Sequence, residues 1–240
     1  MSDIIAIGGA AFSAEPRNLA IDRYILDQTK KDRPNVLFIP TATGDADPYI
    51  AKFYAAYASL DAKPLHLSLF QRTPDLRDVI SAQDAIYVGG GNTKSMLAVW
   101  ADWGLPDLLK QASASGTVLA GVSAGAICWF DQGVTDSWAG SLRPLDGLGF
   151  IPGSCCPHYD SEPERRPSYH ALLAQGTMEP GIAIEDGVAA HYRSGRLERV
   201  VSSRERAWAY QVTIASGVVK EAPIAATFVE DASRNKKRTR

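Results

Sequence analysis

Apolar runs alternate with amphipathic segments through the first half of the chain. Short apolar runs predict buried strands, and segments with apolar residues every three or four positions predict helices. Strands are predicted over residues 4–8, 36–39, 65–69, 85–88 and 117–120. Helices are predicted over residues 15–30, 49–60, 75–81, 96–102 and 106–113. This alternation predicts a parallel, doubly wound sheet, whose ligands bind beyond the carboxyl ends of the strands.

The second half of the chain is richer in β segments. A strand is predicted over residues 151–157 and a helix over 164–175, followed by β segments over 181–184, 188–192, 197–201 and 207–212. Ser194-Gly195 is typical of a hairpin turn between two of them. No linker, repeat or low-complexity tract divides the chain. We therefore expect one α/β domain over residues 1–232, with a mostly parallel sheet and a β-rich C-terminal edge.

The composition is that of a soluble globular protein, with 45% hydrophobic and 22% charged residues. No apolar run reaches the ~18 residues needed to span a bilayer, and no basic segment precedes the first apolar run. We expect a cytoplasmic protein with no membrane partner. The three cysteines, of which Cys155 and Cys156 are adjacent, predict neither a disulfide framework nor a zinc site. No metal and no cofactor are expected.

The last residues of the chain are strongly basic. The net charge is -2, but residues 234–240 carry +5, which leaves -7 on the rest. We interpret residues 233–240 as a solvated, disordered tail. A polyphosphate partner is the alternative, and no nucleic-acid partner is expected.

Residues 117–130 carry the clearest chemical signature. Gly121 and Gly125 lie two positions either side of Ser123, between the predicted strand over 117–120 and a predicted helix over 126–130. This pattern is a nucleophile elbow, in which a serine hydroxyl points out from a strained strand-to-helix turn. The glycines let the strand and the helix approach without a Cβ clash. The amide of Ala124, at the start of the helix, is then free to bind a developing oxyanion.

A run of three glycines, residues 89–91, follows the predicted strand over 85–88. Consecutive backbone amides in such a turn can cradle a phosphate or stabilise an oxyanion. The run lacks the spacing of a P-loop and of a dinucleotide fingerprint. We therefore expect Gly90 or Gly91 to supply a second oxyanion amide beside Ser123. Gly8-Gly9, after the first strand, is a weaker nucleotide-binding candidate.

A catalytic serine needs a base, and His158 is the best placed of the four histidines. It follows a strand and a proline and opens a polar loop, where a side chain can face a cleft. Its imidazole would take the hydroxyl proton and return it to the leaving amine. His66, His170 and His191 lie within predicted strands or helices, where a structural role is expected.

Three motifs together resemble the peptidase E family of aspartyl dipeptidases. They are Gly-Gly-Gly-Asn-Thr at 89–93, Gly-Val-Ser-Ala-Gly-Ala at 121–126 and Pro-His-Tyr-Asp at 157–160. The resemblance implies a flavodoxin-like three-layer α/β sandwich, related to class I glutamine amidotransferases, with Ser123 as nucleophile and His158 as base. Serine in place of the amidotransferase cysteine argues against ammonia transfer. The wider family also includes cyanophycinases.

The resemblance also points to the third member of a catalytic triad. The family pattern places an acid before a glycine in a late strand-turn, and alignment on Gly187 selects Asp186. Glu185 is the alternative, because neighbouring residues of an extended segment point to opposite sides. Asp136 falls where the family has an aspartate needed for activity. Asp160 lies only two residues from His158.

The family's substrates are dipeptides with an amino-terminal aspartate. An arginine after the catalytic histidine is expected to pair with that side chain, which makes Arg165 and Arg166 the candidates. Asn92 and Asp136 complete the expected substrate-binding set. The sequence thus predicts a serine dipeptidase, acting as a monomer or homodimer on small peptides. A cyanophycinase-like or other amide hydrolase and a non-catalytic binding protein are the alternatives.

Overall fold

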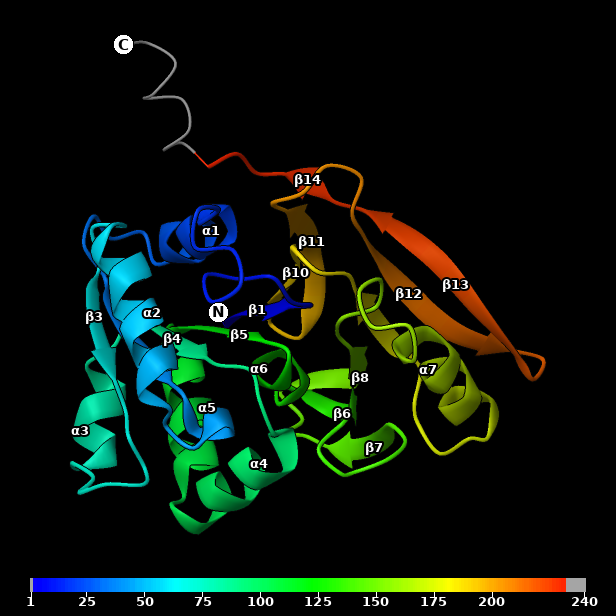
Figure 1. Cartoon of the computed structure of the whole chain (residues 1–240), viewed down its shortest axis with the longest axis horizontal. Helices are drawn as coiled ribbons and strands as arrows, with labels where there is room; N and C mark the ends of the chain where they lie inside the picture. The colour runs from blue at the N-terminus through cyan, green and yellow to red at the C-terminus, as the bar shows by residue number, and fades with distance from the viewer. Residues whose placement is uncertain (1, 232–240) are drawn as a thin grey trace.

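The computed structural model describes residues 2–231, which contain two mixed sheets (Figure 1). The first sheet has eight strands in the order β14 (Thr227–Phe228), β11 (Arg196–Ser202), β10 (Val188–Arg193), β1 (Asp3–Ile7), β5 (Val118–Val122), β4 (Ala85–Val88), β2 (Asn35–Ile39) and β3 (Lys63–His66). The strands from β1 to β3 in that order are parallel. At the other side of β1, β10 pairs antiparallel with β1 and β11 pairs antiparallel with β10.

Helices cover both faces of this sheet. They are α1 (Ala20–Gln28) and α2 (Asp47–Ala58) on one face, and α3 (Leu76–Ser81), α4 (Thr93–Asp102) and α5 (Leu105–Ala114) on the other. A short 3₁₀ turn, Thr41–Thr43, leads from β2 towards α2. Successive residues of a strand point to opposite faces. Accordingly, Ile5 and Ile7 pack with α1 and α2, whereas Ile4 and Ala6 pack in the cluster with α3, α4 and α5.

The second sheet has six strands and lies to one side of the first (Figure 1). Its order is β13 (Val218–Ala225), β12 (Trp208–Ala215), β9 (Gly181–Ile184), β8 (Ile151–Cys156), β6 (Phe130–Thr135) and β7 (Arg143–Asp146). The helix α7 (Arg165–Ala174) packs on this sheet through Tyr169 and Leu173. One hydrophobic cluster joins residues of both sheets, such as Leu119 of β5 and Ile182 of β9, so the sheets share packing.

The predicted α/β class is confirmed, and the sheets are mixed. The expectation of a single sheet with a β-rich edge needs correction, because the second half of the chain divides between two sheets. The strands β10 and β11 join the first sheet, whereas β9 and β12 pair with each other in the second. This division depends on strand pairing between distant segments, which the pattern of a single strand does not specify.

Several element boundaries also differ from the predictions. The first helix begins at Ala20 rather than at residue 15, and Asn18 before it donates a side-chain hydrogen bond to the Ser203 carbonyl. The helix after Ser123 ends at Ile127, and strand β6 follows from Phe130. The predictions did not include β6, β7, β13 and β14. The basic segment 233–240 lies outside the described residues.

Asp22 on α1 gives the fold a predictable response to pH. Its side chain is 1% exposed and accepts a hydrogen bond from the Tyr57 hydroxyl at 3.1 Å. Burial raises the pKa of Asp22 from 3.8 to about 7, and the negative charge of Asp231 adds to this rise. A carboxyl group whose pKa is higher in the folded state stabilises the fold at low pH. That stabilisation is lost progressively as the pH rises from about 4 to about 7, and stability does not change further with this group above that pH.

We therefore expect the replacement Asp22→Asn to flatten the dependence of stability on pH. Between about pH 4 and 7 the wild type should lose about 2–4 kcal/mol relative to the variant, because the carboxyl group of the unfolded chain ionises in this range while the buried group stays protonated. Thermal or urea unfolding across this pH range measures the difference. Parallel stability curves for the two proteins would contradict the assignment.

Candidate active site

Ser123 lies at the turn between β5 and the short helix α6 (Ala124–Ile127). Its backbone has φ 56° and ψ -110°, a conformation that residues other than glycine rarely adopt. The Ser123 N–H donates a hydrogen bond to the Ile7 carbonyl at 3.0 Å, which ties the turn to the end of β1. The structure therefore has the strained strand-to-helix turn that the sequence predicts.

The two flanking glycines are required by close backbone contacts. A Cβ at Gly121 would overlap the carbonyl of Gly125, and a Cβ at Gly125 would overlap the carbonyl of Val88 at the end of β4. Both positions therefore exclude any larger residue unless the backbone moves. This contact explains the spacing of the motif: the glycines let α6 turn back over the ends of β4 and β5 while Ser123 stays half-exposed.

His158 and Asp186 form a hydrogen-bonded pair. The Nδ1 atom of His158 lies 2.8 Å from Oδ1 of Asp186, and each side chain is 19% exposed. Burial alone would raise the pKa of Asp186. Hydrogen bonds from His158 and Ser161 and the charge of Arg204 outweigh burial and hold the pKa of Asp186 below its usual value. Asp186 is therefore an ionised partner for the imidazole at neutral pH.

The guanidinium of Arg204 fixes the backbone around Asp186. Arg204 donates from one guanidinium nitrogen to the Asp186 carbonyl at 2.8 Å and from the other to Oδ2 of Asp160 at 3.0 Å. The other carboxylate oxygen of Asp160 accepts the Asp186 N–H at 2.8 Å. Asp160, which lies two residues after His158 in the sequence, thus holds the turn that carries Asp186. No sequence spacing points to Arg204, because it reaches the site from another loop.

The glycine pair after β1 supports the same arrangement. The His158 N–H donates to the Gly8 carbonyl at 3.2 Å, and the Gly187 N–H donates to the Gly9 carbonyl at 2.9 Å. A Cβ at Gly9 would overlap both Asp186 and the His158 ring. The sequence suggested only a weak nucleotide-binding candidate here. In the structure the pair lets β1 approach the histidine and the acid.

Glu185, the alternative acid, faces away from His158. Its side chain is 8% exposed. One carboxylate oxygen accepts the Trp208 N–H at 2.8 Å, and the other accepts the Tyr210 hydroxyl at 2.9 Å. The two neighbouring acids therefore point to opposite sides, and the geometry places Asp186, not Glu185, on the histidine.

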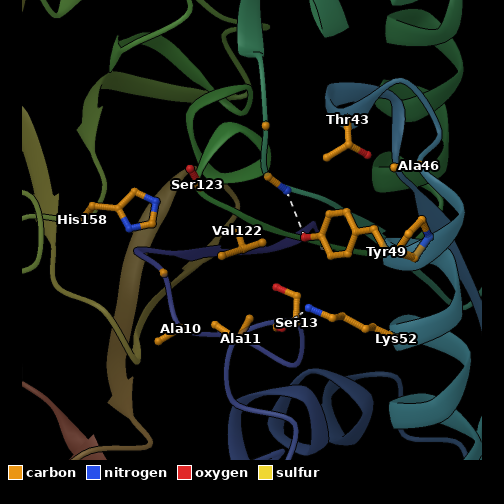
Figure 2. A pocket seen from close by; sticks show the side chains of 15 residues that line it. Ala10, Ala11, Ser13, Thr43, Ala46, Tyr49, Lys52, Val122, Ser123 and His158 are labelled. Carbon is orange, nitrogen blue, oxygen red and sulfur yellow. Dashed lines mark hydrogen bonds between the residues drawn. The ribbon is translucent and has the colours of Figure 1, made fainter.

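The predicted oxyanion amides have different surroundings. The Gly90 N–H donates to the Tyr49 hydroxyl at 3.2 Å (Figure 2). Gly91 has φ 134°, and a Cβ there would overlap the Ala42 carbonyl. Ala124 is the first residue of α6, so its N–H has no acceptor within the helix. Of the three predicted oxyanion donors, only the Gly90 N–H already donates a hydrogen bond to a side chain, whereas the N–H groups of Gly91 and Ala124 do not.

A cavity of about 500 Å³ opens beside Ser123 and His158 (Figure 2). We call it the Ser123 pocket. Its walls come from the loop after β1, the loop after β2, the first turns of α2 and the glycine run at 90–91. Most of the lining is small or apolar, and the polar side chains include Tyr49, Lys52 and Ser13. The pocket thus lies beyond the carboxyl ends of the parallel strands, as the sequence predicts for ligands of this sheet.

Two of the expected substrate-binding residues have structural contacts outside this pocket. Asn92 accepts the Ser95 N–H at the start of α4 and donates to the Ser137 carbonyl, at 2.9 and 3.0 Å. Asp136 has a side chain that is 66% exposed, and its Oδ1 lies 3.7 Å from a guanidinium nitrogen of Arg165. Neither residue lines the Ser123 pocket.

The two arginines are also placed elsewhere. Arg165 is 2% exposed and donates to Glu162 at 2.6 Å and to the Val134 carbonyl at 2.7 Å. It therefore joins α7 to β6. The guanidinium of Arg166 stacks 4.6 Å from the ring centroid of Tyr159 and pairs with Glu221 at 3.3 Å. The structure brings neither arginine into the Ser123 pocket.

Within residues 2–231, no three or more His, Cys, Asp or Glu side chains are grouped so as to hold a metal ion. Over the same residues, no helix has the length and apolar character needed to cross a membrane.

Comparison with known proteins places the site in a family. The model of peptidase family S51 matches residues 4–200. The uncharacterized peptidase YgaJ of Bacillus subtilis is 49% identical, with 95% of this chain and all of that protein covered. Peptidase E of Shewanella putrefaciens is 30% identical over 67% of this chain and 72% of its own length.

Two solved structures share the fold. A peptidase from an acI-B1 actinobacterium superposes with a TM-score of 0.74 and 20% identity, covering 94% of this chain and 95% of that one. A putative peptidase E from Listeria monocytogenes gives a TM-score of 0.63 and 21% identity, covering 85% and 98%. The two structures show the shared fold. The family match and the sequence relatives show that the chain belongs to peptidase family S51, the peptidase E family.

Proposed function

We propose that this S51 peptidase is a serine dipeptidase, which hydrolyses small peptides through an acyl-enzyme formed on Ser123. One observation carries the proposal: Ser123 and His158 line the same pocket, and His158 is hydrogen-bonded to an ionised Asp186. A nucleophile, a base and a carboxylate that orients the base are the parts that acyl transfer by serine requires. Helices on both faces of the eight-stranded sheet support the flavodoxin-like sandwich that the family resemblance implies.

The proposed reaction has two halves. In the first, His158 takes the Ser123 hydroxyl proton as Oγ attacks the peptide carbonyl carbon. The tetrahedral intermediate collapses, the C–N bond breaks, and His158 returns the proton to the leaving amine. In the second, His158 takes a proton from water, and the hydroxide that forms attacks the ester. The carboxylic acid product then leaves, and Ser123 regains its proton.

The negative charge on the carbonyl oxygen needs donors at the site. We assign this role to the amides of Ala124 and Gly91. The sequence suggested Gly90 or Gly91 as the second donor. The hydrogen bond from Gly90 to Tyr49 favours Gly91, because the Gly90 N–H would have to leave the Tyr49 hydroxyl before it could bind an oxyanion.

Small peptides are the substrates that fit the Ser123 pocket. A cavity of about 500 Å³ built from short turns accommodates a few residues rather than a folded protein. The preference for an amino-terminal aspartate comes to this chain only from its resemblance to the peptidase E family. The placement of Arg165 and Arg166 does not support it, so we propose a dipeptidase without assigning an arginine to recognise the first side chain.

Active-site labelling combined with a substrate screen tests the proposed function. A fluorophosphonate should add covalently to Ser123, which mass spectrometry of peptide fragments can locate, and the same protein should hydrolyse members of a dipeptide library. Failure to label Ser123 would show that it is not an activated nucleophile. Labelling with hydrolysis of cyanophycin, but of no dipeptide, would replace the dipeptidase with the other amide hydrolase.

A further inference from the structure

The charges around the Ser123 pocket are unbalanced. Lys52 is the one lysine or arginine among the described residues that line the pocket, and no aspartate or glutamate lines it. The Lys52 ammonium donates to the Ser13 carbonyl at 3.0 Å. None of the ion pairs within residues 2–231 includes Lys52. The pocket therefore presents a positive charge that is held by a neutral carbonyl and has no carboxylate partner.

Lys52 is exposed to solvent and lies along the wall of the pocket. It follows Tyr49 by about one turn of α2, and Figure 2 shows both side chains across the pocket from His158. The rest of the wall is largely alanine, glycine, proline and valine. A charged group that enters such a pocket needs a partner of opposite sign, because an unpaired charge that leaves water is costly.

A free dipeptide has an ammonium group at one end and a carboxylate at the other. The pocket offers no carboxylate for the ammonium end but offers Lys52 for the carboxylate end. His158 lines the same pocket, and in the proposed mechanism His158 protonates the leaving amine, so the leaving residue must lie on its side of Ser123. Both arguments place the carboxyl-terminal residue in the Ser123 pocket.

We propose that Lys52 binds the free carboxylate of the leaving residue and thereby limits the substrates to peptides that end directly after the bond that is cut. This inference rests on the proposed peptidase function. The ammonium of Lys52 would exchange the Ser13 carbonyl for a charged acceptor, which forms a stronger hydrogen bond. A peptide extended by further residues would place a neutral amide where the carboxylate belongs.

Binding to an inactive protein tests the assignment separately from turnover. In the Ser123→Ala background, a dipeptide such as Ala-Leu should bind about 10- to 100-fold more tightly than its carboxyl-terminal amide, Ala-Leu-NH₂, because a charge-assisted bond is lost with the amide. NMR titration measures both dissociation constants. Adding Lys52→Met should remove most of the difference. Adding Lys63→Met, which removes the same charge from strand β3 outside the pocket, should preserve it.

The carboxylate could also come from an acidic side chain, and a second pair of ligands distinguishes the two sources. If Lys52 binds the terminal carboxylate, Lys52→Met should weaken the binding of Asp-Leu and of Asn-Leu by similar factors. A loss confined to Asp-Leu would overturn the proposal and assign Lys52 to the first side chain. Equal binding of Ala-Leu and Ala-Leu-NH₂ by the Ser123→Ala protein would also overturn it.

Turnover by the active protein tests the role of Lys52 separately from the proposed peptidase function. With Lys52→Met, we expect kcat/KM for Ala-Leu to fall about 10- to 100-fold while the rate of fluorophosphonate labelling of Ser123 stays within about twofold. If the wild type is neither labelled nor active, the proposed peptidase function fails. The binding comparison in the Ser123→Ala protein still decides whether Lys52 holds a terminal carboxylate.

Discussion

Replacement of Ser123 by alanine is expected to reduce peptide hydrolysis by about 10⁶-fold while the protein remains folded. The change removes only the hydroxyl oxygen, so the acyl-enzyme cannot form. The Ser123 N–H keeps its hydrogen bond to the Ile7 carbonyl, and the flanking glycines keep the close approach of α6 to β4 and β5. Steady-state kinetics on a cleaved dipeptide measure the loss, and thermal unfolding checks the fold.

A matched serine outside the site provides the control. Ser141 is exposed and does not line the Ser123 pocket, so Ser141→Ala should keep wild-type activity and fluorophosphonate labelling. The Ser123→Ala protein should not be labelled at all. If it retained more than about a tenth of the wild-type rate, some other group would be the nucleophile.

The serine turn could be predicted from sequence because its determinants are local. The strand, the turn and the helix are consecutive, and the glycines either side of Ser123 are required by contacts within the same turn and with β4. The same holds for the strands that begin the chain, where a short apolar run is enough to identify a strand buried on both faces. His158 was likewise recognisable, because it opens a polar loop directly after a strand.

The rest of the site depends on segments that are far apart in sequence. The Tyr49 hydroxyl accepts a hydrogen bond from the Gly90 N–H, and Arg204 donates one to the Asp186 carbonyl. No sequence spacing predicts either contact. Arg165 is the converse case, in which the sequence suggests a role that the structure does not support. An arginine seven residues after His158, the proposed base, suggests carboxylate recognition, yet its guanidinium is buried against Glu162 and β6. The sequence motifs identify candidate site residues, but the contacts that these side chains make depend on the fold.

The two neighbouring acids lead to the second large effect. Asp186→Asn is expected to lower kcat by about 10³- to 10⁴-fold, because a carboxylate on Nδ1 of His158 fixes the tautomer and stabilises the imidazolium, whereas an amide can select the wrong tautomer. Glu185→Gln should leave kcat within about threefold. Its carboxylate accepts from Trp208 and Tyr210, so its loss should appear as reduced stability of about 1–3 kcal/mol.

Comparison of these two variants separates catalysis from folding. Kinetics and thermal unfolding of both proteins should show this difference: Asp186→Asn is the more damaging to kcat, whereas Glu185→Gln lowers stability with little effect on kcat. Because the pKa of Asp186 lies below its usual value, its carboxylate is ionised throughout the neutral range. Changes in wild-type activity between pH 5 and 9 should therefore come from groups other than Asp186. A larger loss of kcat in Glu185→Gln would mean that Glu185, not Asp186, orients His158 during the reaction.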